Sequence, residues 1–139
     1  MKNILVLCTG NSCRSQIAHG YFDMILKEKA NIYSAGIETH GLNENAVKSM
    51  ARDRVDISSY TSNNVLEYND INFDYIITVC DHANENCPYF PSKESKRVHK
   101  NFVDPSKIKN SKNIEKEFDK CRDEIKAFSK EFKKNIFLN

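Results

Sequence analysis

The distribution of apolar residues along the chain predicts alternating β-strands and α-helices. Two short runs are almost wholly apolar, which is typical of strands covered on both faces of a sheet. Other segments repeat apolar residues every three or four positions, the spacing of a helix with one buried face. Residues 58–70 are polar and ambiguous, and fit a loop with a short helix. Strands are predicted at residues 4–7, 31–37, 75–79 and 98–103, and helices at 15–29, 43–53 and 114–132.

This alternation implies right-handed β–α–β units and therefore a parallel sheet with helices on both faces. We expect an α/β fold of three α/β/α layers around a central parallel sheet of about four strands, in one domain that spans residues 1–139. Ligands of such folds bind beyond the carboxyl ends of the strands. Cys8 and Cys80 each follow a predicted central strand, so both belong to that region of the sheet.

Charge and composition exclude several classes of partner. The 139 residues carry 21 basic and 19 acidic side chains, a formal net charge of +2. So small an excess gives no reason to expect nucleic acid or an anionic membrane as a partner. No apolar run approaches the roughly 18 residues of a transmembrane helix, and the apolar run near the N-terminus is too short for a signal peptide. We expect a cytoplasmic protein that acts as a monomer.

The cysteines suggest chemistry, since an odd number of them, five, argues against a framework of structural disulfides. Cys8 and Cys13 are five positions apart, and Cys80 and Cys87 are seven apart. Neither spacing matches a zinc knuckle, so no metal site is expected. Cys121 lies on the apolar stripe of the last predicted helix, where a packed, inert thiol is expected.

The loop between the first strand and the first helix has the features of an oxyanion site. Its backbone N–H groups and the positive end of the following helix can bind an anion together, and Gly10 lets the chain bend. Arg14 supplies a planar, two-pronged donor. The same field stabilises a thiolate at Cys8, the expected nucleophile, with Ser15 donating to it and Asn11 holding the loop through its amide. Cys13 is expected to point elsewhere and be structural. The predicted oxyanion-binding residues are Thr9, Gly10, Asn11, Ser12, Cys13 and Arg14.

Three stretches carry a resemblance to a known family: CTGNSCRS at 8–15, YSAGIETHG at 33–41 and NFVDP at 101–105. They resemble the low-molecular-weight protein tyrosine phosphatases and, more closely, the thioredoxin-coupled arsenate reductases built on that fold. The resemblance runs from residue 1 to the last helix and is weaker at 60–71 and 106–113. The phosphatases usually carry a tyrosine after the Asp-Pro pair, whereas this chain has Ser106.

The resemblance implies reduction of arsenate to arsenite by three cysteines. Cys8 attacks arsenate while Asp104 protonates the departing oxygen. Cys80 then forms a Cys8–Cys80 disulfide, and Cys87 resolves it to a Cys80–Cys87 disulfide that thioredoxin reduces. Glutaredoxin with glutathione is an open alternative as reductant. Two other functions stay open: a tyrosine phosphatase that uses Cys8, Arg14 and Asp104, and an oxyanion-binding or redox-sensing module without catalysis.

The relay constrains the segment that holds its last two cysteines. If residues 80–87 are helical in the reduced protein, they rise by about 10 Å, whereas a disulfide needs Cα atoms within about 7 Å. We therefore predict that residues 80–90 are a switch, helical or turn-like when reduced and unwound when oxidised. Asn84, Asn86 and Pro88 are poor residues for a helix interior and lower the cost of unwinding.

The reductases that this chain resembles often hold a potassium ion beside the loop. The matching positions here are Asn11, His19, Thr61 and Asn63, where two expected carboxylates are replaced by His19 and Asn63. We therefore expect a degraded potassium site, no cofactor, and activity that is indifferent to potassium. His82 could favour a Cys80 thiolate or be a solvated loop residue, and His40 and His99 are expected at the surface or in packing.

Overall fold

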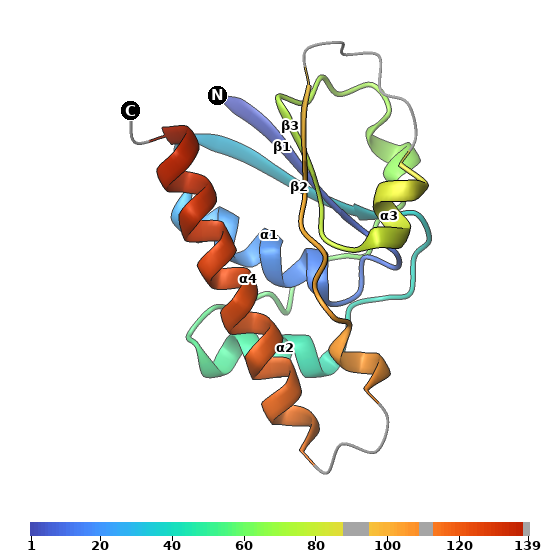
Figure 1. Ribbon diagram of the computed structural model, residues 1–139, viewed down its shortest axis with the longest axis vertical. Coiled ribbons are helices and arrows are strands. Elements are labelled where there is room, and N and C mark those ends of the chain that lie inside the picture. Colours follow the sequence, from blue (N-terminus) through green and yellow to red (C-terminus); the bar gives the residue numbers. More distant parts are fainter. Residues whose placement is uncertain (88–94, 109–112, 138–139) are drawn as a thin grey trace.

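The computed structural model describes residues 1–87, 95–108 and 113–137 (Figure 1). The strands are β1 Lys2–Cys8, β2 Ala30–Gly36, β3 Tyr75–Thr78 and β4 Lys96–His99. The α-helices are α1 Arg14–Ile25, α2 Glu44–Arg52, α3 Asp81–Glu85 and α4 Ile114–Phe137, and two 3₁₀ turns are η1 Val65–Tyr68 and η2 Pro105–Lys107. Within the described ranges, none of the helices is both long and apolar enough to cross a bilayer.

The four strands form one parallel sheet in the order β2-β1-β3-β4, which confirms the predicted fold class. The chain moves outward from β1 to β2, and then returns to the other side of β1 to add β3 and β4. The strand order therefore reverses between β1 and β3, and in open parallel sheets such a reversal leaves a crevice at the carboxyl ends of the two strands. Cys8 ends β1, and Cys80 follows β3 by two residues.

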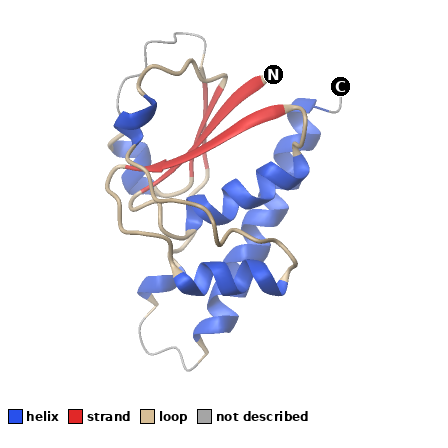
Figure 2. Cartoon of the chain, turned by 180° about the vertical axis from the view of Figure 1, so that it is seen from behind, coloured by secondary structure: helices blue, strands red, loops and turns tan. Residues whose placement is uncertain are grey.

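Helices cover both faces of the sheet (Figures 1 and 2). Against one face lie α1 and α4, where the ring of Tyr75 on β3 packs edge-on against Phe132 of α4 with centroids 5.3 Å apart. The opposite face is covered by α3 and η1, where Tyr33 on β2 packs against Tyr68 at 5.3 Å. The core between these layers contains the fully buried β1 residues 4–7.

Two predicted boundaries were wrong, each for a local physical reason. The helix predicted at 15–29 ends at Ile25, and Glu28 adopts a left-handed backbone with φ 68°, which does not continue a right-handed helix. The strand predicted at 98–103 runs instead over Lys96–His99. It is an edge strand whose side chains are mostly exposed, so apolar patterning does not mark its start. The predicted switch is helical at Asp81–Glu85, and its residues 88–90 lie outside the described part of the chain.

Candidate active site

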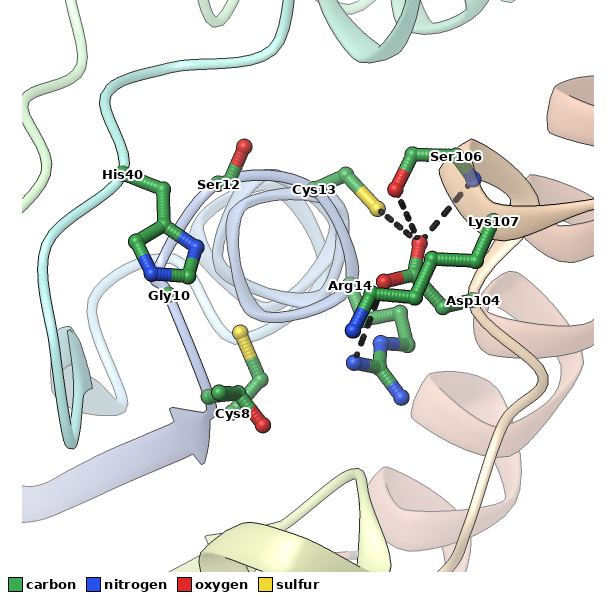
Figure 3. Close-up of a pocket in the computed structure, with 10 residues that line it drawn as sticks. Cys8, Gly10, Ser12, Cys13, Arg14, His40, Asp104, Ser106 and Lys107 are labelled. Carbon is green, nitrogen blue, oxygen red and sulfur yellow. Dashed lines mark hydrogen bonds and ion pairs between the residues drawn. The ribbon is translucent and has the colours of Figure 1, made fainter.

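A small pocket lies at the carboxyl end of β1, above the loop that joins β1 to α1 (Figure 3). Its volume is about 80 Å³, well below the roughly 300–1,000 Å³ of sites for drug-sized ligands. The predicted residues Cys8, Thr9, Gly10, Ser12, Cys13, Arg14 and Asp104 line it, together with His40, Ser106 and Lys107. The pocket therefore brings most of the predicted oxyanion residues together around a space suited to a small anion.

A chain of hydrogen bonds with a defined direction ends on the Cys8 sulfur. The backbone N–H of Asn63 donates to Asn11 Oδ1 at 2.8 Å, which fixes the orientation of the Asn11 amide. The Nδ2 of Asn11 then donates to Ser15 Oγ at 2.7 Å. Because Ser15 Oγ accepts that bond, its own proton is directed to Cys8 Sγ, 2.9 Å away. A donor aimed at sulfur stabilises a thiolate, so the geometry supports Cys8 as a nucleophile.

The backbone of the loop is held in an unusual conformation. Asn11 is completely buried and has φ 47°, a left-handed value that asparagine tolerates better than most residues. Gly36, at the end of β2, lies against the loop so closely that a Cβ there would be 2.7 Å from the Asn11 nitrogen. The conformation of the loop therefore depends on β2 and on residue 63 as well as on its own sequence.

Arg14 and Asp104 lie side by side on the wall of the pocket (Figure 3). Arg14 donates from Nη1 to the carbonyl of Phe102 at 3.0 Å, and its Nη2 lies 3.5 Å from Asp104 Oδ2. The other carboxyl oxygen, Oδ1, accepts the backbone N–H of Ser106 at 2.9 Å and its hydroxyl at 2.7 Å. Burial opposes ionisation of Asp104, but these hydrogen bonds and the charge of Arg14 outweigh it and lower the pKa of the carboxyl. In the resting site Asp104 is thus a carboxylate that must acquire a proton before it can donate one.

The prediction that Cys13 points away from the site was wrong. Its Sγ lies 3.7 Å from Asp104 Oδ1, because Cys13 is the N-cap of α1 and its side chain is directed toward η2 (Figure 3). Burial, followed by the charge of Asp104, raises the pKa of Cys13 well above that of an ordinary thiol. On α4, burial and Glu124 raise the pKa of Cys121 to about 12. Both are therefore neutral thiols.

Cys80 lies next to the loop across the gap between β1 and β3. Leu7 pairs with Thr78, and the Val79 N–H bonds the Leu7 carbonyl at 2.9 Å, so the ladder extends one residue past the strand. Ordinary strand spacings then place the Cα atoms of Cys8 and Cys80 about 6 Å apart, which a disulfide can bridge.

The two thiols nevertheless face different partners. Cys8 Sγ is bonded to Ser15, whereas Cys80 Sγ lies 3.3 Å from Thr9 Oγ1 and accepts the Ala83 N–H at 3.4 Å as the N-cap of α3. Contact between the two sulfurs therefore requires the first turn of α3 to release Cys80. The ring of His82 bonds Thr9 at 3.2 Å, not Cys80.

Cys87 follows α3, and its Sγ lies 2.9 Å from Nη1 of Arg97 on β4. This contact places a positive charge beside the Cys87 sulfur. Cys80 is the N-cap of the five-residue helix α3, and Cys87 follows its C-cap, so the two cysteines lie at opposite ends of this short helix.

Three pocket residues had no predicted role: His40, Ser106 and Lys107. His40 was expected at the surface or in packing, but its ring lies over Gly10, where a Cβ would be 2.3 Å from His40 Nδ1. Its Nε2 bonds Glu38 at 2.6 Å. Ser106 could have been found from its position directly after the Asp-Pro pair. Lys107 carries no signal in the sequence beyond its charge.

The residues at the expected potassium position are hydrogen-bonded to other protein groups. His19 Nδ1 bonds Ser34 Oγ at 2.7 Å, and its Nε2 lies 3.3 Å from Asp23. The hydroxyl of Thr61 donates to Asn63 Oδ1 at 2.8 Å. His19 thus bonds Ser34 and Asp23, whereas Thr61 bonds Asn63, and no carboxylate lies at residue 19 or 63.

Comparisons with known proteins agree with this geometry. Residues 3–137 match the family model described as low molecular weight phosphotyrosine protein phosphatase. "Arsenate reductase 1" of Staphylococcus epidermidis is 48% identical over 128 residues, 91% of each chain. "Arsenate reductase" of Staphylococcus aureus is 43% identical over 136 residues, 95% of this chain and 96% of that one.

Solved structures show the same fold. The structure "An arsenate reductase in the phosphate binding state" superposes with a TM-score of 0.75 at 25% identity, over 98% of this chain and 99% of that one. The tyrosine phosphatase Wzb from Escherichia coli K30, in complex with sulphate, superposes with a TM-score of 0.77 at 21% identity, over 97% and 98% of the two chains.

Proposed function

The chain belongs to the low molecular weight phosphotyrosine protein phosphatase family, and we propose that it is an arsenate reductase that converts arsenate to arsenite in arsenic detoxification. The observation that carries this proposal is the position of Cys80. A phosphatase needs one nucleophilic cysteine, whereas here a second thiol lies beside the nucleophile's loop, at the carboxyl end of the neighbouring strand. Close relatives that match almost the whole chain are named arsenate reductases.

In the first step, the Cys8 thiolate attacks arsenic in a protonated arsenate anion. A sulfur–arsenic bond forms and one arsenic–oxygen bond breaks. The departing hydroxyl leaves as water after receiving a proton that another hydroxyl of a dihydrogen arsenate anion passes through Asp104. The N–H groups of the loop and the guanidinium of Arg14 bind the remaining oxygens. Arg14 is able to turn from its 3.5 Å contact with Asp104 toward the anion.

In the second step, the Cys80 thiolate attacks Cys8 Sγ. The new sulfur–sulfur bond displaces arsenic, which keeps the electron pair of the broken bond and leaves as arsenite, reduced from As(V) to As(III). The Cys87 thiolate then attacks Cys80 Sγ, which releases Cys8 and leaves a Cys80–Cys87 disulfide. Arg97, 2.9 Å from Cys87 Sγ, supports the thiolate needed for this attack.

The relay requires α3 to unwind. A rise of about 1.5 Å per residue separates the Cα atoms of Cys80 and Cys87 by about 10 Å if the helix continues to residue 87, beyond the reach of a disulfide. The helix is five residues long, with Asn86 as its C-cap, so it has few hydrogen bonds to lose. Hydrogen exchange measured on the dithiol and disulfide forms should show protection of the amides of residues 83–86 only in the dithiol form.

We propose thioredoxin as the reductant and the cytoplasm as the compartment. The electrons of the cycle come from a dithiol that reduces the Cys80–Cys87 disulfide by thiol–disulfide exchange. A reducing compartment also keeps Cys8 available between cycles. Glutaredoxin with glutathione, the alternative reductant, can be compared with thioredoxin in the NADPH-oxidation assay described below.

The deciding experiment follows arsenate-dependent NADPH oxidation coupled through thioredoxin and thioredoxin reductase. Cys8→Ser, Cys80→Ser and Cys87→Ser should each abolish turnover, whereas Cys121→Ser, a matched control in the buried face of α4, should retain it. In single turnover, Cys87→Ser should release one arsenite per chain and accumulate the Cys8–Cys80 disulfide. Sustained turnover by Cys87→Ser would remove this residue from the mechanism.

The phosphatase alternative uses Cys8, Arg14 and Asp104, which share the pocket. It predicts hydrolysis of para-nitrophenyl phosphate that needs Cys8 alone among the five cysteines, and no NADPH oxidation with arsenate. That pair of results would replace the reductase assignment.

A further inference from the structure

Two side chains of the edge strand β4 hold the two ends of the segment that carries the second and third redox cysteines. Arg97 and His99 are two positions apart, so they project from the same face of the strand. Nη1 of Arg97 donates to Cys87 Sγ at 2.9 Å, beyond the end of α3. Nε2 of His99 lies 2.7 Å from Oδ1 of Asp81, the first residue of α3. The strand therefore contacts this segment at both of its ends.

The contact at the first turn of α3 is a double one. A carboxylate only accepts hydrogen bonds, so Nε2 of His99 donates to Asp81. The other ring nitrogen, Nδ1, lies 2.7 Å from the Thr78 hydroxyl, which fixes the orientation of the ring. The backbone N–H of Asp81 is one of the donors that a helix leaves without a partner in its own first turn, and it donates to Asn101 Oδ1 at 3.0 Å. Both the side chain and the backbone of Asp81 are thus held from outside the helix.

The part of the chain that holds Asp81 is itself fixed on β3. The N–H of Lys100 bonds the carbonyl of Thr78 at 3.0 Å. The N–H of Phe102 bonds the carbonyl of Val79 at 3.0 Å. These bonds continue the pairing of β3 with β4 past the end of β4. The first turn of α3 is therefore tied to a frame that stays in place when the helix opens.

The helix α3 has little stability of its own. It is five residues long, and a helix this short does not persist without contacts to the rest of a protein. Its first turn contains Cys80 as the N-cap, whose sulfur accepts the Ala83 N–H at 3.4 Å. Because Cys80 directly precedes Asp81, turning its sulfur toward Cys8 moves the backbone that the contacts to Asp81 hold in place.

We propose that His99 is a positioning residue that latches the first turn of α3 to β3 and β4, and that this latch sets how often Cys80 is released to react at Cys8. The inference rests on the proposed function, in which the sulfur of Cys80 leaves its N-cap position to attack Cys8. It adds the contact that controls this step. Arg97 holds the other end of the segment, so loss of His99 loosens the first turn while Cys87 stays in contact with β4.

The first test is hydrogen exchange in the intact dithiol protein. In His99→Ala, the amides of residues 83, 84 and 86 should exchange about 3- to 10-fold faster, the range for the loss of one hydrogen bond. The amides of β1 should keep their wild-type rates, because the latch governs a local opening and not global unfolding. His99→Gln keeps an N–H donor near the position of Nε2 and should restore most of the protection. Lys100→Ala, an exposed neighbour on the opposite face of the chain, is the matched control and should exchange like the wild type.

A double-mutant cycle tests whether the latch acts through Asp81. In an Asp81→Ala background the His99 ring has lost its partner on α3. Replacing His99 by alanine in that background should therefore produce no further acceleration of exchange in α3. A full second acceleration would show that His99 acts on α3 through some other contact and would contradict the latch.

The second test measures the release of Cys80 chemically and without arsenate, in a Cys87→Ser background. Hydrogen peroxide converts the Cys8 thiolate to a sulfenic acid and leaves hydroxide. The Cys80 thiol then displaces the hydroxyl of the sulfenic acid as water and forms the Cys8–Cys80 disulfide, unless a second peroxide first oxidises the sulfenic acid to a sulfinic acid. At a fixed peroxide concentration, the ratio of disulfide to sulfinic acid, measured by mass spectrometry, should be about 3- to 10-fold higher in His99→Ala.

Wild-type exchange rates in α3 of His99→Ala would overturn the proposal, and so would an equal acceleration of the β1 amides or an unchanged ratio of disulfide to sulfinic acid. Failure of the proposed function is distinguishable, because neither test uses arsenate. It would appear instead as absence of arsenite release by Cys87→Ser in single turnover, whatever the exchange rates of α3.

Discussion

Replacing Ser15 by alanine tests whether the hydrogen-bond chain from Asn63 through Asn11 makes Cys8 reactive. The substitution removes the hydroxyl 2.9 Å from Cys8 Sγ at a completely buried position, where water does not replace it. A hydrogen bond to a charged group is worth about 1.5–3 kcal/mol, so the thiol–thiolate equilibrium constant of Cys8 should shift about 10- to 150-fold toward the thiol. The remaining thiolate is more basic and more nucleophilic, which recovers roughly half of the logarithmic loss. The net expectation is a rate about 3- to 12-fold lower for a reaction at Cys8.

The assay is alkylation of Cys8 by iodoacetamide near neutral pH, in a Cys80→Ser/Cys87→Ser background with the modified residue located by mass spectrometry. Iodoacetamide is neutral, so its rate reports the thiolate and not anion binding. The two other cysteines of that background are buried neutral thiols and should react slowly. Ser15→Thr keeps the hydroxyl and should react like the parent. Equal rates for Ser15→Ala and the parent, with the fold intact by circular dichroism, would refute this account of Cys8.

Three further predictions concern other parts of the molecule. Gly36→Ala should abolish arsenate reduction, because its Cβ would lie 2.8 Å from the backbone carbonyl carbon of Gly10. Gly10→Ala should retain more activity, because its Cβ would meet the side chain of His40, which can turn. Equal losses of activity in the two variants would contradict this reasoning. Asp119→Asn should lower the melting temperature by about 3 °C at pH 7, for a loss of about 1 kcal/mol at this partly exposed ion pair. Burial raises the pKa of Asp119, but hydrogen bonds from Arg52 outweigh it and lower the pKa overall. The stabilisation is therefore present above about pH 4 and is lost as the pH falls through the folded pKa, below which the two melting temperatures should converge. Initial rates in potassium and sodium buffers of equal ionic strength should agree within error, because His19 and Asn63 stand where the resemblance leads us to expect carboxylates. Strong stimulation by potassium would contradict this expectation.

The sequence predicted the parts of the fold that depend on local patterning. The central strands β1 and β3 are buried on both faces, so each is marked in the sequence by a run of consecutive apolar residues. The edge strand β4 is mostly exposed and lacks that signal, and its position is fixed by pairing with β3, from Tyr75 with Lys96 to Thr78 with His99. Pairing across a sheet is a tertiary property, so the boundary of such a strand is not contained in its own residues.

The site divides in the same way. The arrangement of residues 8–15 was predictable because the strand, the loop and the helix N-terminus that form the candidate anion site are contiguous in the chain. The groups that tune the loop come from elsewhere: Asn63 bonds Asn11 across 52 positions, and Ser106 and Lys107 approach only because η2 is held beside α1. The side-chain direction of Cys13 also depends on η2, which is why it was predicted incorrectly.

Cys8, the proposed nucleophile, and Cys13 have different surroundings in the same loop. Both lie near the N-terminus of α1, whose positive end favours a thiolate at either position. The two differ in what faces the sulfur: Cys8 receives the proton of the Ser15 hydroxyl, whereas Cys13 faces the Asp104 carboxylate, which accepts its proton and repels its charge. At Cys13 the carboxylate thus adds to burial, the largest cause of the raised pKa, whereas the Cys8 sulfur faces a hydroxyl donor. Asp104→Asn removes the negative charge that faces Cys13 Sγ. The Cys13 thiol should therefore react faster with iodoacetamide in this variant, although its position is unchanged.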